Sequence, residues 1–168
     1  HRLVALLARR EELAGLGTMA AGLAHELNNP AAALRRSAKE LGPANDLRDA
    51  RAIALFARPL SAAEMRGALE LGAVATRQFQ EGQSGFVLGA GEEDALVTAL
   101  EGYGVEEPWR AAGALVDAGW TAAALNAAAQ PFAAENRAAV ADWLAADAAC
   151  RTLLREISLS SQAVSSLV

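Results

Sequence analysis

One short stretch of the chain, LAHELNNPAA over Leu23–Ala32, combines residue types that can carry chemistry. His25 is one of only two histidines in the 168 residues, and Glu26, Asn29 and Pro30 follow it closely. A water-exposed imidazole is mostly neutral near pH 7, so a ring nitrogen can act as a nucleophile, a base or a metal ligand. His25 is therefore the first candidate for a functional residue.

Metal binding and hydrolytic catalysis find little support around His25. The sequence His-Glu begins the zinc-protease motif H-E-x-x-H, which needs a second histidine four residues later. That position is Asn29, and the other histidine is His1. No G-x-S-x-G sequence is present to supply a serine nucleophile. We therefore expect no metal site and no hydrolase triad.

The apolar residues around His25 indicate a long helix with a narrow stripe. They fall at steps of three and four, the a and d spacing of a coiled coil or helix bundle: Leu13, Leu16, Ala20, Leu23 and Leu27. With Leu13 at position a, His25 falls at position f, away from the stripe. A histidine that packs a core would lie on the stripe. His25 is therefore interpreted either as a functional residue or as an ordinary solvent-facing histidine.

A proline and three glycines interrupt this helical pattern. Pro30 cannot donate to the carbonyl of Glu26, which costs ~3 kcal/mol or more inside a helix. We therefore predict a kink at Pro30, just past His25. Gly15, Gly17 and Gly22 each cost about 1 kcal/mol relative to alanine. They indicate either close helix packing or flexibility near the site.

Composition predicts an all-α chain. Apolar residues, many of them alanine, make up 53% of the sequence, and aromatic residues only 5%. The net charge of −5 argues against a nucleic-acid interface, which needs a basic face. A single cysteine, Cys150, cannot form an internal disulfide and suggests a reducing cytoplasm. No apolar run approaches the ~20 residues of a membrane span. Because the chain begins without Met, we expect it to be a piece of a longer protein.

The pattern divides the chain into three parts. The first helix runs over residues 3–41 and is expected to end at Gly42-Pro43. The last segment, residues 150–168, repeats the a and d spacing and is expected to continue past Val168. Helix hairpins are normally joined by about 2–8 residues, so the long segment between them must be an inserted subdomain. The predicted boundaries are residues 1–41, 42–149 and 150–168.

Start and stop signals predict several short helices in the insertion. Ser61 and Glu64 form a capping box that opens a helix toward Gln80. A glycine-rich loop, EGQSGFVLGAGEED, and a short helix over residues 95–100 follow. The next signals are Pro108 at a first helical position, a helix end at Gly119, a cap at Thr121, and Pro131 before a helix through Trp143. Three tryptophans are expected to anchor the core, with a ligand pocket as the alternative: Trp109, Trp120 and Trp143.

The stretch LAGLGTMAAGLAHELNNPAAALRRSAKEL, residues 13–41, resembles the first helix of the dimerisation and phosphoacceptor domain of sensor histidine kinases. The H-E-x-x-N-P core of that helix matches at His25, Glu26, Asn29 and Pro30. The terminal REISLSSQAVSSLV resembles the second helix of the same hairpin. The resemblance implies an antiparallel hairpin that dimerises into a four-helix bundle, with the helical subdomain inserted in the hairpin.

The resemblance also implies a histidine protein kinase fragment of a two-component system. His25 would take the γ-phosphoryl group of ATP and pass it to an aspartate of a response regulator. Glu26 would act as a base, and Asn29 would position water for dephosphorylation of the regulator.

The ATP apparatus itself is expected outside this chain. The segment GFVLGAG, residues 85–91, lacks the motifs of the ATP-binding lobe, and no G-x-x-x-x-G-K-[ST] occurs. ATP and Mg²⁺ would bind a separate catalytic domain, so we expect no cofactor here. The implied partners are a second copy, that catalytic domain and a response regulator, with no nucleic acid and no membrane contact. Arg35 and Arg36 could meet the regulator, although an ordinary solvated face is favoured. A structural adaptor in which His25 is incidental and a ligand-sensing module are the alternatives.

Overall fold

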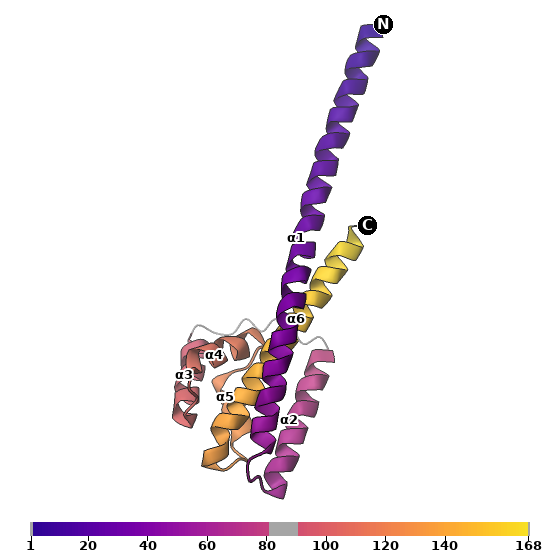
Figure 1. The fold of residues 1–168 in the computed structure, drawn as a ribbon. Coiled ribbons are helices and arrows are strands. Elements are labelled where there is room, and N and C mark those ends of the chain that lie inside the picture. The colour runs from indigo at the N-terminus through magenta and orange to yellow at the C-terminus, as the bar shows by residue number, and fades with distance from the viewer. Residues whose placement is uncertain (1, 81–90, 168) are drawn as a thin grey trace. The chain divides into compact units, whose positions relative to one another are not determined.

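The computed structural model describes the backbone of residues 2–80 and 91–167, and the side chains of residues 19, 22–73 and 91–167. Across these residues the chain is helical and contains no strand, which confirms the all-α prediction. The helices are α1 Arg2–Phe56, α2 Ala62–Gln80, α3 Glu92–Tyr103, α4 Pro108–Asp117, α5 Ala122–Ala129 and α6 Ala134–Ser166 (Figure 1).

The chain divides into two compact units. The first unit combines residues 1–39 with residues 155–168, and the second unit contains residues 40–154. The boundaries predicted from sequence, after residue 41 and before residue 150, lie near these divisions. Helices α1 and α6 each contribute residues to both units.

The predicted helix end at Gly42-Pro43 is wrong, because α1 continues to Phe56. Pro43 removes only one backbone donor, and residues 44–56 are rich in alanine, leucine and arginine, which favour helix. Leu55, in the last turn, is fully buried in the second unit. Tertiary packing of this kind supplies most of a helix's stability and can offset the cost of an internal proline.

The prediction of two separate helices, one through Trp143 and one over residues 150–168, is also wrong. Residues from Ala134 to Ser166 form one helix, which starts three residues after Pro131. The intervening segment, residues 144–149, contains no glycine or proline and consists of leucine, alanine and one aspartate. Most of these side chains are buried, so nothing in the sequence or the packing interrupts the helix.

The shorter helices follow their predicted signals. The Ser61 hydroxyl accepts from the backbone N–H of Glu64 at 3.2 Å, and α2 reaches Gln80 as expected. Pro108 occupies the start of α4, and Thr121 caps α5 by accepting from Ala124 N–H at 3.1 Å. Gly119 follows α4 with φ of 82°, a left-handed conformation that favours glycine. Of the predicted glycine-rich loop, residues 81–90 lie outside the described residues. The prediction that the loop includes residues 92–94 is wrong, because α3 runs over Glu92–Tyr103 and is longer than the expected helix over residues 95–100.

Core side chains of the second unit come from all the helices α1 to α6 and from the turns between them. The largest that are fully buried include Leu55, Leu96, Leu100, Leu115, Leu125, Phe132 and Val140. Trp143 is buried and meets the Phe56 ring edge-on at a centroid distance of 6.5 Å. Trp120 is half-buried against this core.

Trp109 contradicts the prediction that all three tryptophans are core anchors, because 63% of it is exposed. The buried positions of α4 share one face: Pro108, Ala111, Ala112 and Leu115. Trp109 follows Pro108 by one residue and therefore points away from that face.

A buried carboxylate joins the start of α2 to the start of α6. Glu64 accepts hydrogen bonds from Ser61 N–H at 2.8 Å, Ser61 Oγ at 2.7 Å, Ala133 N–H at 2.8 Å and Asn136 Nδ2 at 3.1 Å. Asn136 in turn accepts from Arg58 Nε at 2.8 Å. These donors, led by Ala133 N–H, lower the pKa of Glu64 to about 2.

The single cysteine is buried within the same unit. Cys150, on α6, exposes 1% of its surface. Loss of hydration disfavours the thiolate, so burial raises the pKa of the Cys150 thiol. This cysteine therefore behaves as a small apolar core residue.

Candidate functional site

His25 lies on the part of α1 that belongs to the first unit, and its side chain is exposed. The neighbouring stripe residue Leu23 is 49% exposed, and Leu27 is half-buried. At heptad position f, His25 is expected to lie away from the apolar stripe. The exposed ring agrees with this expectation. An incoming domain can therefore reach this imidazole.

Glu26 and Asn29 are exposed on the same segment of helix. Asn29 is four residues from His25, so the two side chains share one helix face. Glu26 is adjacent in sequence to His25, and neighbours at this spacing do not face each other. The three residues thus form a convex surface patch. A patch of this shape can be engaged by another folded domain, but it does not enclose a small substrate.

Pro30 is half-buried, and α1 is helical on both sides of it. The bend expected at this proline remains a prediction. A methyl group added at Gly22 would meet no atom within 4 Å, so close packing within the described residues does not explain this glycine. Gly15 and Gly17 lie among the residues whose side chains are outside the description.

Exposure falls along the heptad stripe from the site toward residue 39. On the stripe, Leu23 is 49% exposed, whereas Leu27, Pro30 and Leu34 are half-buried. Met19, at the flanking position g, is 71% exposed. The side chains of Leu13, Leu16 and Ala20 lie outside the described residues. The exposed part of the stripe is apolar surface that a second helical chain could cover.

A polar contact joins the two segments of the first unit, and sequence analysis did not single it out. Ser37 is 3% exposed, and its hydroxyl donates to Glu156 Oε2 at 2.6 Å. Continuing the heptad from Leu27 at a through Leu34 at a places Ser37 at d, so its burial follows from the register. The sequence near Ser37 does not indicate which residue accepts its hydrogen bond, because Glu156 is 119 residues away.

Two arginines near the site are solvent-exposed. Arg35 and Arg36 follow the H-E-x-x-N-P motif by one to two turns, and neither forms an ion pair with an acidic residue of the described chain. This arrangement fits the ordinary solvated face that the sequence favoured.

No group of three or more His, Cys, Asp or Glu side chains among the described residues is arranged to hold a metal ion. Within residues 2–80 and 91–167, no helix has both the length and the apolar character required to cross a membrane.

Comparisons with protein-family models, with curated proteins and with solved structures found no match to this chain. The functional assignment therefore depends on the residues themselves.

Proposed function

We propose that this chain is the phosphoacceptor and dimerisation region of a two-component sensor histidine kinase, with His25 as the phosphorylated residue. The observation that carries the proposal is the H-E-x-x-N-P sequence on a helix where His25 and Asn29 are exposed on one face. An accessible histidine on a convex helix surface suits a group that must meet two different protein domains in turn.

The chemistry would proceed in two transfers. A nitrogen of His25 attacks the γ-phosphorus of ATP, the bond from that phosphorus to the bridging oxygen breaks, and ADP leaves. A carboxylate of the response regulator then attacks the same phosphorus and releases the imidazole. Phosphoryl transfer depends mainly on alignment and charge neutralisation, so ATP and Mg²⁺ bound by a separate catalytic domain would supply most of the catalysis.

The neighbouring residues would have supporting roles. Glu26 would accept the proton that the imidazole loses or orient the ring, and Asn29 would position a water molecule when the regulator is dephosphorylated. The partners would be a second copy of the chain, its catalytic domain and the receiver domain of a regulator. Because ATP is the donor, the chain would act in the cytoplasm.

The proposal is tested by labelling the 168-residue chain. The chain is incubated with [γ-³²P]ATP and a separately expressed ATP-binding domain of a sensor histidine kinase, and in parallel with phosphoramidate, a small phosphodonor. We expect phosphate that is labile in acid and stable in alkali, as a phosphorus–nitrogen bond requires. His25→Gln should remove at least nine-tenths of the label.

Matched variants separate the proposal from a structural role for the helix. His1→Gln removes the other histidine and should leave labelling unchanged. Asn29→Ala should still be phosphorylated, but should lose the ability to speed dephosphorylation of a regulator. The chain would instead be a structural adaptor if neither donor labels it, or if His25→Gln is labelled as strongly as the parent.

A further inference from the structure

A pocket of about 390 Å³ opens within the second unit. Its walls come from residues 40–51 of α1, from residues 106–114, which precede and begin α4, and from residues 142–153 of α6. Small-molecule sites typically occupy about 300–1,000 Å³, so this volume matches a small organic ligand. None of the wall residues belongs to the segment that carries His25.

The floor of the pocket is apolar because the facing helices present alanine. Ala111 and Ala114 of α4 and Ala145, Ala146 and Ala149 of α6 all line the pocket. A methyl side chain leaves unfilled space where a leucine would close the gap between helices. Two larger apolar residues, Leu47 and Leu153, also line the pocket. The surface would hold an aromatic or aliphatic group by burial of apolar area.

The polar lining of the pocket carries an excess of negative charge. Four carboxylates and two guanidinium groups line it: Glu40, Glu106, Glu107, Asp142, Arg51 and Arg110. Arg51 pairs with Asp142 at 3.5 Å, and Arg110 pairs with Glu107 at 3.4 Å. Among the described residues, Glu40 and Glu106 form no ion pair.

The ion pair with Arg51 does not fully offset the hydration that the Asp142 carboxylate loses on burial. Loss of hydration raises the pKa of the Asp142 carboxyl, the Arg51 guanidinium opposes this effect, and the charge of Glu106 adds to it. Asp142 and Glu106 both line the pocket, and their like charges repel. A cation placed beside both carboxylates would relieve the repulsion and replace lost hydration.

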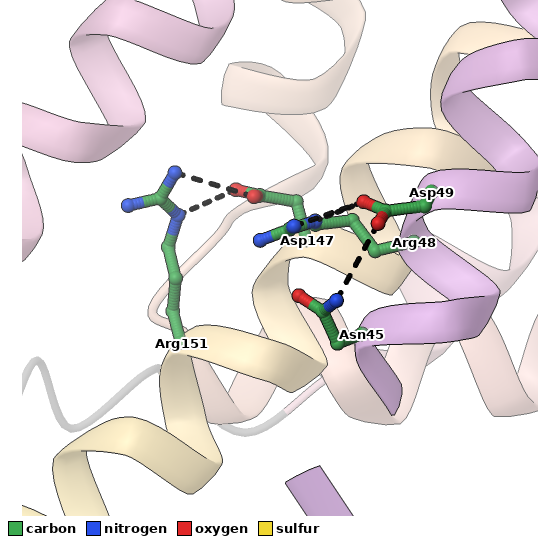
Figure 2. Close-up of polar contacts among 5 residues, drawn as sticks. All are labelled: Asn45, Arg48, Asp49, Asp147 and Arg151. Atoms are coloured by element: carbon green, nitrogen blue, oxygen red, sulfur yellow. Dashed lines mark hydrogen bonds and ion pairs between the residues drawn. The ribbon is translucent and has the colours of Figure 1, made fainter. Parts of the chain in front are cut away.

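Nearby arginines do not reverse this preference for a cation. Arg48 donates to Asp49 at 2.9 Å, and Asn45 donates to the other oxygen of Asp49 at 3.4 Å. Arg151 pairs with the buried Asp147, as Figure 2 shows. Each of these guanidinium groups already has a carboxylate partner, and neither Arg48 nor Arg151 lines the pocket.

We propose that this pocket binds a small organic cation, an amine with an aromatic or aliphatic body. The body lies on the alanine floor, and the ammonium group lies between Glu106 and Asp142. An organic cation fits better than a metal ion, because no three of the described His, Cys, Asp or Glu side chains, the carboxylates of the pocket included, are placed to hold one metal ion together. The inference uses only the second unit and does not depend on phosphorylation of His25.

The test compares three ligands of the same shape and different charge. Isothermal titration of the 168-residue chain is carried out with tryptamine, with the neutral tryptophol and with the anionic indole-3-acetate. We expect saturable binding of one tryptamine per chain, about fivefold weaker binding of tryptophol, and weaker binding still of indole-3-acetate. Equal affinity for the three ligands, or no saturable binding of tryptamine, would overturn the proposal.

Variants locate the binding in the pocket. Glu106→Gln and Asp142→Asn should each weaken tryptamine about fivefold and leave tryptophol unchanged. Ala114→Leu, which fills the pocket, should weaken both ligands. Glu93→Gln makes the same charge change on an exposed residue of α3 outside the pocket and should have no effect.

Helicity and melting temperature are measured for every variant, so that a folding defect is recognised. Glu106 is exposed, so Glu106→Gln is expected to leave the fold intact. This variant tests the proposal even if Asp142→Asn unfolds the chain. The proposal fails if Glu106→Gln binds tryptamine as tightly as Glu93→Gln does.

Discussion

At the scale of single residues, the carboxylate of Glu64 makes stability depend on pH. Its pKa is about 2 in the folded chain, against an ordinary value of 4.5. The ionised group therefore contributes its full stabilisation above about pH 4.5, and this contribution is lost as the pH falls toward 2. Two of the hydrogen bonds that lower this pKa, from Ala133 N–H and Asn136 Nδ2, come from outside the capping box.

We expect Glu64→Gln to unfold at lower urea concentration than the parent at pH 7, and the difference between the two to shrink between pH 4.5 and pH 2. Urea titrations across this range measure the difference directly. Glu70→Gln, an exposed substitution on the same helix, is the control and should follow the parent throughout. A constant gap between parent and Glu64→Gln over these pH values would contradict the assignment.

Local patterns predicted some residue-level features and missed others. The capping box of Ser61 and Glu64 was readable because its members are three residues apart. The two further donors to Glu64 lie 69 and 72 residues away, and no sequence period connects them. The same distinction applies to Ser37, whose burial follows from the heptad although its acceptor Glu156 does not.

At the scale of elements, α1 contains a glycine that the fold does not need. Gly42 lies inside the helix, and a methyl group added there would meet no atom within 4 Å. We expect Gly42→Ala to stabilise the chain by about 0.5–1 kcal/mol, because alanine loses less conformational entropy in a helix. Thermal unfolding followed by circular dichroism should show a rise of a few degrees, roughly 2–4 °C per kcal/mol for a chain of this size.

The matched control is Gly104→Ala. This glycine also has open space around it, but its φ of +82° is costly for any residue with a side chain. The control should lower the melting temperature. If both substitutions shift it in the same direction, backbone conformation does not decide the outcome.

Helix existence was more predictable than helix length. Caps at Ser61, Pro108 and Thr121 marked real starts, because each satisfies or removes a backbone donor locally. The Gly42-Pro43 pair failed as a stop signal, since packing of the following turns, including Leu55, outweighs its local cost. The full length of α6 was also missed. The sequence showed two helical patterns, and the structure joins them into one helix because no residue between them interrupts it.

At the scale of the whole molecule, the exposed end of the stripe leads us to expect a dimer. Leu23 on the stripe and Met19 beside it present apolar surface that one copy leaves uncovered. Light scattering after size exclusion should report about twice the chain mass of 17.4 kDa. Leu23→Glu should shift the chain to the monomer, because association would bury the new charge.

The control for this measurement is Leu69→Glu, a similar change at an exposed position of α2 in the second unit. It should leave the dimer intact. A parent chain that remains monomeric at the highest soluble concentration would contradict dimerisation through the stripe.

The pocket of the second unit could not be predicted from sequence. Its walls come from three segments separated by more than fifty residues and by nearly thirty, and nothing in any one segment indicates that the three come together. Alanine signals helix propensity in a sequence, whereas a cavity appears only when several alanine faces meet. No tryptophan lines this pocket, so it differs from the pocket at the tryptophans that the sequence offered as an alternative, and that alternative stays a prediction.

The buried thiol of Cys150 has a practical consequence for studying this molecule. A protonated, inaccessible sulfur reacts slowly with thiol-directed reagents, because the thiolate is the reactive form. An added cysteine at an exposed position such as Ala38 would then be modified selectively, without first removing the natural one. Spin or fluorescent labels at such positions could follow subunit association and ligand occupancy in solution.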